Sequence, residues 1–190
     1  MSVTITFELD DSDIEHFRAM AQEAQDAAKS SGLSAEKITA GARELFQSAD
    51  TAKMPEFVSS RLRKLRTLVD MVEDSEWQLP EEDLERVLSA MAYFADPEDL
   101  IPDRIPGIGF LDDAIMVELV VENLEEEITS YEEFCAYRAA EEQRRKNQGM
   151  DTDVGREDWL ADKRAVLHSR MRKRRSERTR SSGYRGIRLF

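Results

Sequence analysis

Four aspartates within a segment rich in proline and glycine, residues 96–113, are the side chains of this sequence best placed to do chemistry. They are Asp99, Asp103, Asp112 and Asp113. Carboxylate oxygens without histidine suit a hard cation such as magnesium or calcium, and a bound metal would allow a metal-dependent enzyme. Aspartate also caps helices, because its oxygens accept hydrogen bonds from free backbone N–H groups at a helix N-terminus. The sequence alone leaves metal binding and capping open.

The same segment has a restricted backbone and carries a resemblance to a known family. Proline and glycine at positions 102, 106, 107 and 109 favour a shaped loop between helices. The residues of the resemblance are Pro97, Asp99, Leu100, Ile101, Pro102, Asp103, Ile105, Pro106, Gly109, Leu111, Asp112 and Asp113. They are similar to the signature of the YkvA-like family, a bacterial group of small helical proteins or domains. The resemblance covers about residues 58–125, implies a helical fold and assigns no activity. Arg104 stands where that family tends to have an apolar or aromatic residue, which disfavours contact of the loop with lipid.

The other candidate site is a basic tail on an acidic chain. The net charge of the chain is −13, but residues 163–190 hold 11 Lys or Arg against one Glu, a net of +10. The 16 basic and 39 acidic residues that remain give residues 1–162 a net of −23. Such asymmetry indicates that the tail meets an anionic surface.

The guanidinium groups of this tail can hydrogen-bond phosphates, and one aromatic ring can stack on bases. We therefore expect RNA or a ribonucleoprotein as the partner. The predicted contact residues are Arg170, Arg172, Lys173, Arg174, Arg175, Arg178, Arg180 and Tyr184. In a first alternative, the tail is clamped on the acidic body of the same chain, or on that of a second copy in a homodimer. The protein would then be a self-association or adaptor module. A second alternative is an anionic membrane surface, because apolar residues from Trp159 to Met171 lie beside basic ones.

Hydrophobic periodicity predicts a mainly α protein, a single bundle of about six to eight helices. Residues 1–11 contain a strand over 3–9, which would pair either with the C-terminal segment 186–190 or across a dimer axis. Residues 12–147 form the helical domain, 148–155 a linker, and 156–190 an amphipathic helix with the basic tail. Capping boxes are expected at Ser12 with Glu15 and at Ser130 with Glu133.

Other chemistry has little support in the sequence. Cys135 is the only cysteine, which excludes an internal disulfide and fits a cytoplasmic protein. His16 and His168 lie far apart and have no metal-ligand spacing with it. No cofactor-binding glycine motif is present, and no apolar run is long enough to span a bilayer. We therefore expect a non-catalytic interaction protein without a cofactor.

Overall fold

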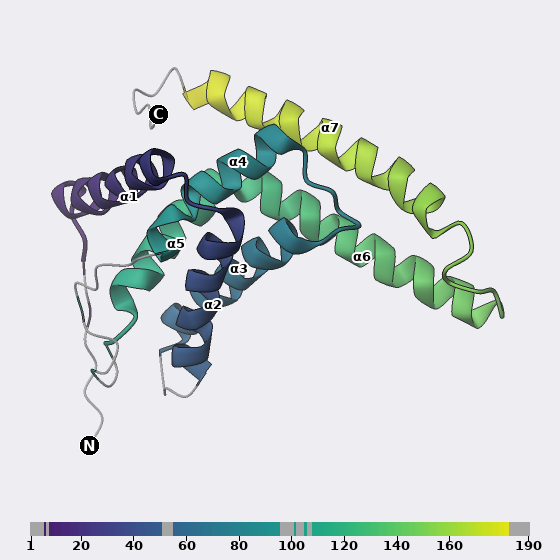
Figure 1. The fold of residues 1–190 in the computed structure, drawn as a ribbon, viewed down its shortest axis with the longest axis horizontal. Coiled ribbons are helices and arrows are strands. Elements are labelled where there is room, and N and C mark those ends of the chain that lie inside the picture. The colour runs from purple at the N-terminus through teal and green to yellow at the C-terminus, as the bar shows by residue number, and fades with distance from the viewer. Residues whose placement is uncertain are drawn as a thin grey trace. The chain divides into compact units, whose positions relative to one another are not determined.

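The computed structural model describes residues 6, 8–50, 55–95, 101, 105 and 108–182 (Figure 1). These residues form seven α-helices and one short 3-10 helix, and the mainly α prediction is confirmed. The helices are α1 Asp11–Ser31, α2 Ala35–Asp50, α3 Glu56–Glu73, α4 Glu81–Ala90, the 3-10 helix η1 Ala92–Ala95, α5 Leu111–Asn123, α6 Glu125–Asn147 and α7 Arg156–Ser182.

The N-terminal strand predicted over residues 3–9 is not seen. Thr6, Glu8 and Leu9 are described and lie in no strand, and the rest of that segment falls outside the described residues. The partner segment 186–190 also falls outside them. Alternation of apolar and polar residues is a weak signal when no second strand is available to hydrogen-bond the backbone.

The chain divides into two compact units where a single bundle was expected. The first unit comprises Met1–Val69 and Glu81–Asn123, and the second comprises Asp70–Pro80 and Leu124–Phe190. The segment Asp70–Pro80 is thus grouped with helices far along the chain. Local sequence patterns cannot reveal such a division, because it depends on contacts between residues distant in sequence.

In the first unit, helix α2 packs closely against η1, the element that leads into the 96–113 loop. The close approach occurs at Gly41, where a Cβ atom would lie 2.0 Å from the carbonyl oxygen of Phe94. Phe94 and the neighbouring Ala42 are both buried. Glycine at position 41 therefore lets the two backbones meet and fixes where the loop begins.

Helix α1 begins two residues before the predicted capping box. Asp10 is the N-cap and accepts hydrogen bonds from the N–H groups of Ser12 and Asp13, while Asp13 bonds back to the Asp10 N–H. The box predicted at Ser12 and Glu15 is wrong, because Asp10 offers a carboxylate, a strong acceptor at this position. The helix ends at Ser31, and the C-cap Gly32 has a φ of 61°, the left-handed conformation common at helix ends.

In the second unit, α6 and α7 lie side by side as a hairpin (Figure 1). Helix α6 ends at Asn147 and α7 begins at Arg156, so residues 148–155 connect the two helices. The side chains of Leu160, Leu167 and Met171 on α7 are fully buried.

The start predicted for α6 at Ser130 is wrong. Leu124 alone separates α5 from α6, and α6 begins at Glu125. Three glutamates in its first turn, Glu125, Glu126 and Glu127, complement the positive end of the helix dipole. Ser130 lies inside the helix and is buried.

Candidate functional site

The turn between α3 and α4 is built by Asp74. One oxygen of its carboxylate accepts hydrogen bonds from the backbone N–H groups of Glu76, at 2.9 Å, and of Trp77, at 3.2 Å. This local cap turns the Trp77 side chain inward, where it is fully buried. Its ring centroid lies 5.1 Å from that of Phe134 on α6 and 4.3 Å from that of His168 on α7.

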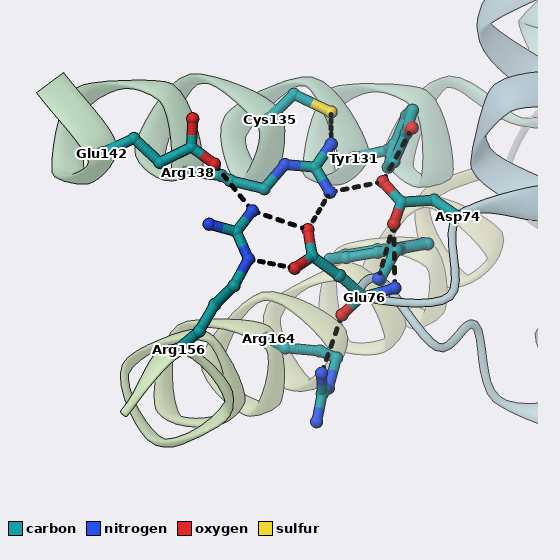
Figure 2. Close-up of polar contacts among 9 residues, drawn as sticks. Asp74, Glu76, Tyr131, Cys135, Arg138, Glu142, Arg156 and Arg164 are labelled. Atoms are coloured by element: carbon teal, nitrogen blue, oxygen red, sulfur yellow. Dashed lines mark hydrogen bonds and ion pairs between the residues drawn. The ribbon is translucent and has the colours of Figure 1, made fainter. Parts of the chain in front are cut away.

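Glu76, one residue before Trp77, binds two arginines through its carboxylate (Figure 2). Arg138 of α6 donates to it at 2.8 Å, and Arg156 of α7 donates through two nitrogens, Nη2 at 3.0 Å and Nε. Arg156 also reaches Glu142 of α6 at 2.6 Å. The backbone carbonyl of Glu76 accepts a further bond from Arg164 at 2.7 Å. A single short turn is therefore bonded to both helices of the hairpin.

The other carboxylate oxygen of Asp74 completes the network on the α6 side (Figure 2). It accepts from the Tyr131 hydroxyl at 3.1 Å and pairs with Arg138 at 2.8 Å. The same guanidinium lies 3.7 Å from the Cys135 sulfur. We call Asp74, Glu76, Arg138, Arg156 and Glu142 the turn network.

The electrostatics of the turn network favour ionised, mutually bonded groups. Hydrogen bonds from Arg156 lower the pKa of Glu76 below its ordinary value, with Arg138 adding to the effect. Burial raises the pKa of the Cys135 thiol and of the Tyr131 hydroxyl. A buried thiol with a raised pKa is a poor nucleophile at neutral pH. The arrangement thus suits holding the hairpin in place, not attacking a substrate.

The basic residues predicted to contact RNA lie on α7, and four of them bond to glutamates of α6. Arg170 donates to Glu133 at 2.5 Å. The remaining contacts are Arg174 with Glu126 and Glu133, both at 3.9 Å, Arg175 with Glu127 at 2.9 Å, and Arg178 with Glu125 at 2.7 Å. We call these four arginines with their glutamates the α6–α7 clamp. The register of these contacts could not be predicted from local patterns, since they join residues about 35 to 55 positions apart.

Three more of the predicted basic residues, Arg172, Lys173 and Arg180, are exposed on α7. Lys173 lies 4.0 Å from Glu177 on the same helix, a distance at the limit of an ion pair. Tyr184, the predicted stacking residue, lies outside the described residues. The predicted basic set therefore separates into residues facing α6 and residues facing solvent.

The predicted metal site is described only at its C-terminal half. Asp112 and Asp113 lie in the first turn of α5, with 2% and 1% of their surface exposed, and Asp99 and Asp103 fall outside the described residues. Asp112 accepts a hydrogen bond from the backbone N–H of Ile101 at 3.0 Å. In the part of the chain that the structure describes, no three His, Cys, Asp or Glu side chains are grouped as a metal site.

The turn network was missed by sequence reasoning, although one signal was present. Asp74 and Glu76 precede Trp77 in a short connection between helices, where an acidic residue often caps a turn. Their partners, Arg138 and Arg156, lie 62 and 80 residues from Glu76. Nothing in the local pattern connects them.

No described helix is both long enough and apolar enough to cross a membrane. The comparison with protein families finds a match around the 96–113 loop. Residues 86–119 match a family described as "Protein of unknown function (DUF1232)". Over 46 residues the chain is 39% identical to "Uncharacterized membrane protein YkvA" of Bacillus subtilis (strain 168).

The match to that relative is partial. It includes 24% of this chain and 43% of the Bacillus protein, so the chain spans less than half the length of this relative. No solved structure matches the chain. The family match nevertheless includes the segment with the predicted signature. The predicted resemblance is confirmed: residues 86–119 match the DUF1232 family of unknown function, and part of the chain is similar to YkvA.

Proposed function

We propose that this protein is a non-catalytic helical interaction protein whose basic C-terminal tail binds an anionic partner in the cytoplasm, RNA or a ribonucleoprotein. The observation that carries the proposal is the exposed set Arg172, Lys173 and Arg180 on α7. Residues 172 and 180 are eight positions apart, about 12 Å along a helix, which is room for more than one phosphate of a strand. Arginine binds phosphate through two parallel hydrogen bonds, which favours a phosphodiester chain over a single carboxylate.

The turn network supports a role in binding more than one in catalysis. Its carboxylates and guanidiniums are bonded to one another, and they fix the start of α7 against α6. A fixed helix start orients the basic segment that follows. The network is thus a support for the tail.

A second candidate is the adaptor module with the tail clamped on the acidic body, and the α6–α7 clamp favours it. Arg170, Arg174, Arg175 and Arg178 all contact α6 glutamates, so at least half of the eight predicted binding residues already have an anionic partner. On this alternative, α7 stabilises the hairpin and the partner is another protein or a second copy of the chain.

Binding to a fluorescent oligouridine, followed by anisotropy from 50 to 200 mM salt, tests the first proposal. The variant carries Arg172→Gln, Lys173→Gln and Arg180→Gln. If each cation meets a phosphate, the slope of log affinity against log salt falls by about 0.7 per residue, or about two in total. The affinity of the variant for oligouridine at 50 mM salt should fall as well.

The matched control removes the same three charges elsewhere, with Lys29→Gln, Lys37→Gln and Lys64→Gln at exposed positions. Equal losses in both variants would mean that only net charge matters and would contradict a site on α7. No binding of oligouridine by the wild-type chain, with a dimer detected by sedimentation, would select the adaptor module. Binding to anionic vesicles and not to oligouridine would select a membrane surface, a partner in keeping with the Bacillus relative, which is named a membrane protein.

A further inference from the structure

We propose that α7 works in two parts: a stem, residues 156–171, that stays packed on α6, and a latch, residues 172–182, that exchanges α6 glutamates for RNA phosphates. The choice of RNA rests on the proposed function. The division of α7 into stem and latch rests on packing alone.

The stem is held by buried apolar side chains. Leu160, Leu167 and Met171 are each 0% exposed. Removal of such apolar side chains from water is a main source of the stability of a packed helix. Arg156 and Arg164 add hydrogen bonds to Glu76 at the same end of the helix. Because apolar burial is not screened by ions, salt leaves the stem in place.

The latch has a different composition. Residues 172–182, Arg-Lys-Arg-Arg-Ser-Glu-Arg-Thr-Arg-Ser-Ser, contain no apolar side chain, and none of the described side chains from 172 to 180 is buried. Arg174, Arg175 and Arg178 contact α6 through ion pairs with its first-turn glutamates. A segment of 11 residues without such support is too short to remain a stable helix. Screening of the ion pairs should therefore free and unwind the latch while the stem stays packed.

The latch pairs differ in burial, which determines what can release them. The Arg178 and Glu125 side chains are 47% and 65% exposed, and such exposed pairs contribute little to stability. Glu127, the partner of Arg175, is 1% exposed, so separating this pair is costly. A single phosphate ion replaces one exposed carboxylate at most. A polyanion offers several phosphates at once and is the competitor that this arrangement fits.

Hydrogen exchange of the full-length chain without RNA tests the division of α7. Between 50 mM and 1 M NaCl, we expect backbone protection over 172–182 to fall about tenfold or more, while protection over 156–171 stays nearly constant. A parallel loss of backbone protection over 156–171 and 172–182 would overturn the latch. Protection of 172–182 that is unchanged at 1 M NaCl would also overturn it.

The exchange of glutamate for phosphate is tested by a variant with Glu125→Gln, Glu126→Gln and Glu133→Gln. These side chains are 65%, 21% and 35% exposed, and glutamine keeps their shape. Without competing carboxylates, affinity for oligouridine should rise several-fold and protection over 172–182 should fall. The control carries Glu44→Gln, Glu82→Gln and Glu132→Gln, which make none of the clamp contacts and change the net charge equally.

An affinity gain in the clamp variant above that of the control supports the exchange, and an equal or smaller gain overturns it. At the same ionic strength, inorganic phosphate should give the same backbone protection over 172–182 as NaCl does. This comparison distinguishes the effect of a polyanion from that of a free ion. If oligouridine binds no variant at all, the proposed function is wrong. The salt experiment still decides whether the latch exists.

Discussion

Arg175 of α7 donates a hydrogen bond to Glu127 of α6 at 2.9 Å, and only 1% of the Glu127 side chain is exposed. This pair differs from the neighbouring clamp contacts, in which both side chains reach solvent. Taking a charge out of water is expensive unless a partner of opposite charge compensates it. Glu127 thus makes the Arg175 pair the costliest of the latch contacts to break.

Replacing Arg175 with Met should lower the free energy of unfolding of the second unit by about 2–4 kcal/mol, because a buried carboxylate loses this cation. Both tryptophans, Trp77 and Trp159, lie in that unit, so their fluorescence during urea unfolding reports on it. Arg178→Met is the matched control at an exposed pair, and we expect less than about 1 kcal/mol. Equal effects of the two substitutions would contradict the special role of Glu127.

Glu76 should make stability depend on pH. Its folded pKa is lowered below 4.5, mainly by the hydrogen bond from Arg156. A group with a depressed folded pKa contributes fully above its unfolded pKa, and the contribution is lost as pH falls through the folded value. The free energy of unfolding of Glu76→Gln should therefore be about 1–2 kcal/mol lower than that of the wild-type chain at pH 7.

That difference should shrink as the pH falls from 5.5 to 3, because a protonated glutamate resembles glutamine. Glu157→Gln is a suitable control, since its side chain is 61% exposed and pairs with Arg164 outside the turn network. A Glu76 difference that stays constant down to pH 3 would mean that the carboxylate charge does not support the turn.

Local chemistry made several elements predictable. The buried stripe through Val58, Leu62 and Leu65 indicates α3, and the nearly all-apolar run from 114 to 121 indicates the buried helix α5. Gly32 in the left-handed conformation marks the end of α1 as expected. These signals depend on neighbours within a few residues, which a sequence displays directly.

What the sequence could not show depends on distant partners. The basic tail was visible as a composition, but the contact of Arg175 with Glu127 needs the register of two helices. Glu76 has no local feature that distinguishes it from other surface glutamates, and its arginine partners lie far along the chain. The capping box predicted at Ser130 failed for a similar reason, since the preceding glutamates already begin α6.

Gly41→Ala should destabilise the first unit by about 1–3 kcal/mol or more, because the new methyl group meets the Phe94 carbonyl oxygen 2.0 Å away. Thermal unfolding followed by circular dichroism measures the change. Gly32→Ala is a useful comparison, since it has nothing within 4 Å and only its left-handed φ opposes a side chain, at about 1 kcal/mol. If Gly41→Ala is the milder of the two, α2 and η1 are not in close contact.

Cys135 should react slowly with a disulfide reagent at pH 7.5. Burial raises the pKa of its thiol above the ordinary 9.0, so the reactive thiolate is scarce in the folded chain. We expect labelling at least about tenfold slower than in the urea-unfolded chain, where the thiol is exposed. Equal rates in the two states would mean that the thiol next to Tyr131 and Arg138 is open to solvent.

The most direct test of the account compares oligouridine binding by residues 1–171 and residues 1–182 in the same anisotropy titration at 50 mM salt. The longer chain keeps the latch and the shorter chain ends at Met171, the last fully buried residue of the stem. We predict that residues 1–182 retain most of the affinity of the full chain, while residues 1–171 lose about tenfold or more. Unchanged affinity in residues 1–171, or complete loss already in residues 1–182, would contradict a binding site on the latch of α7.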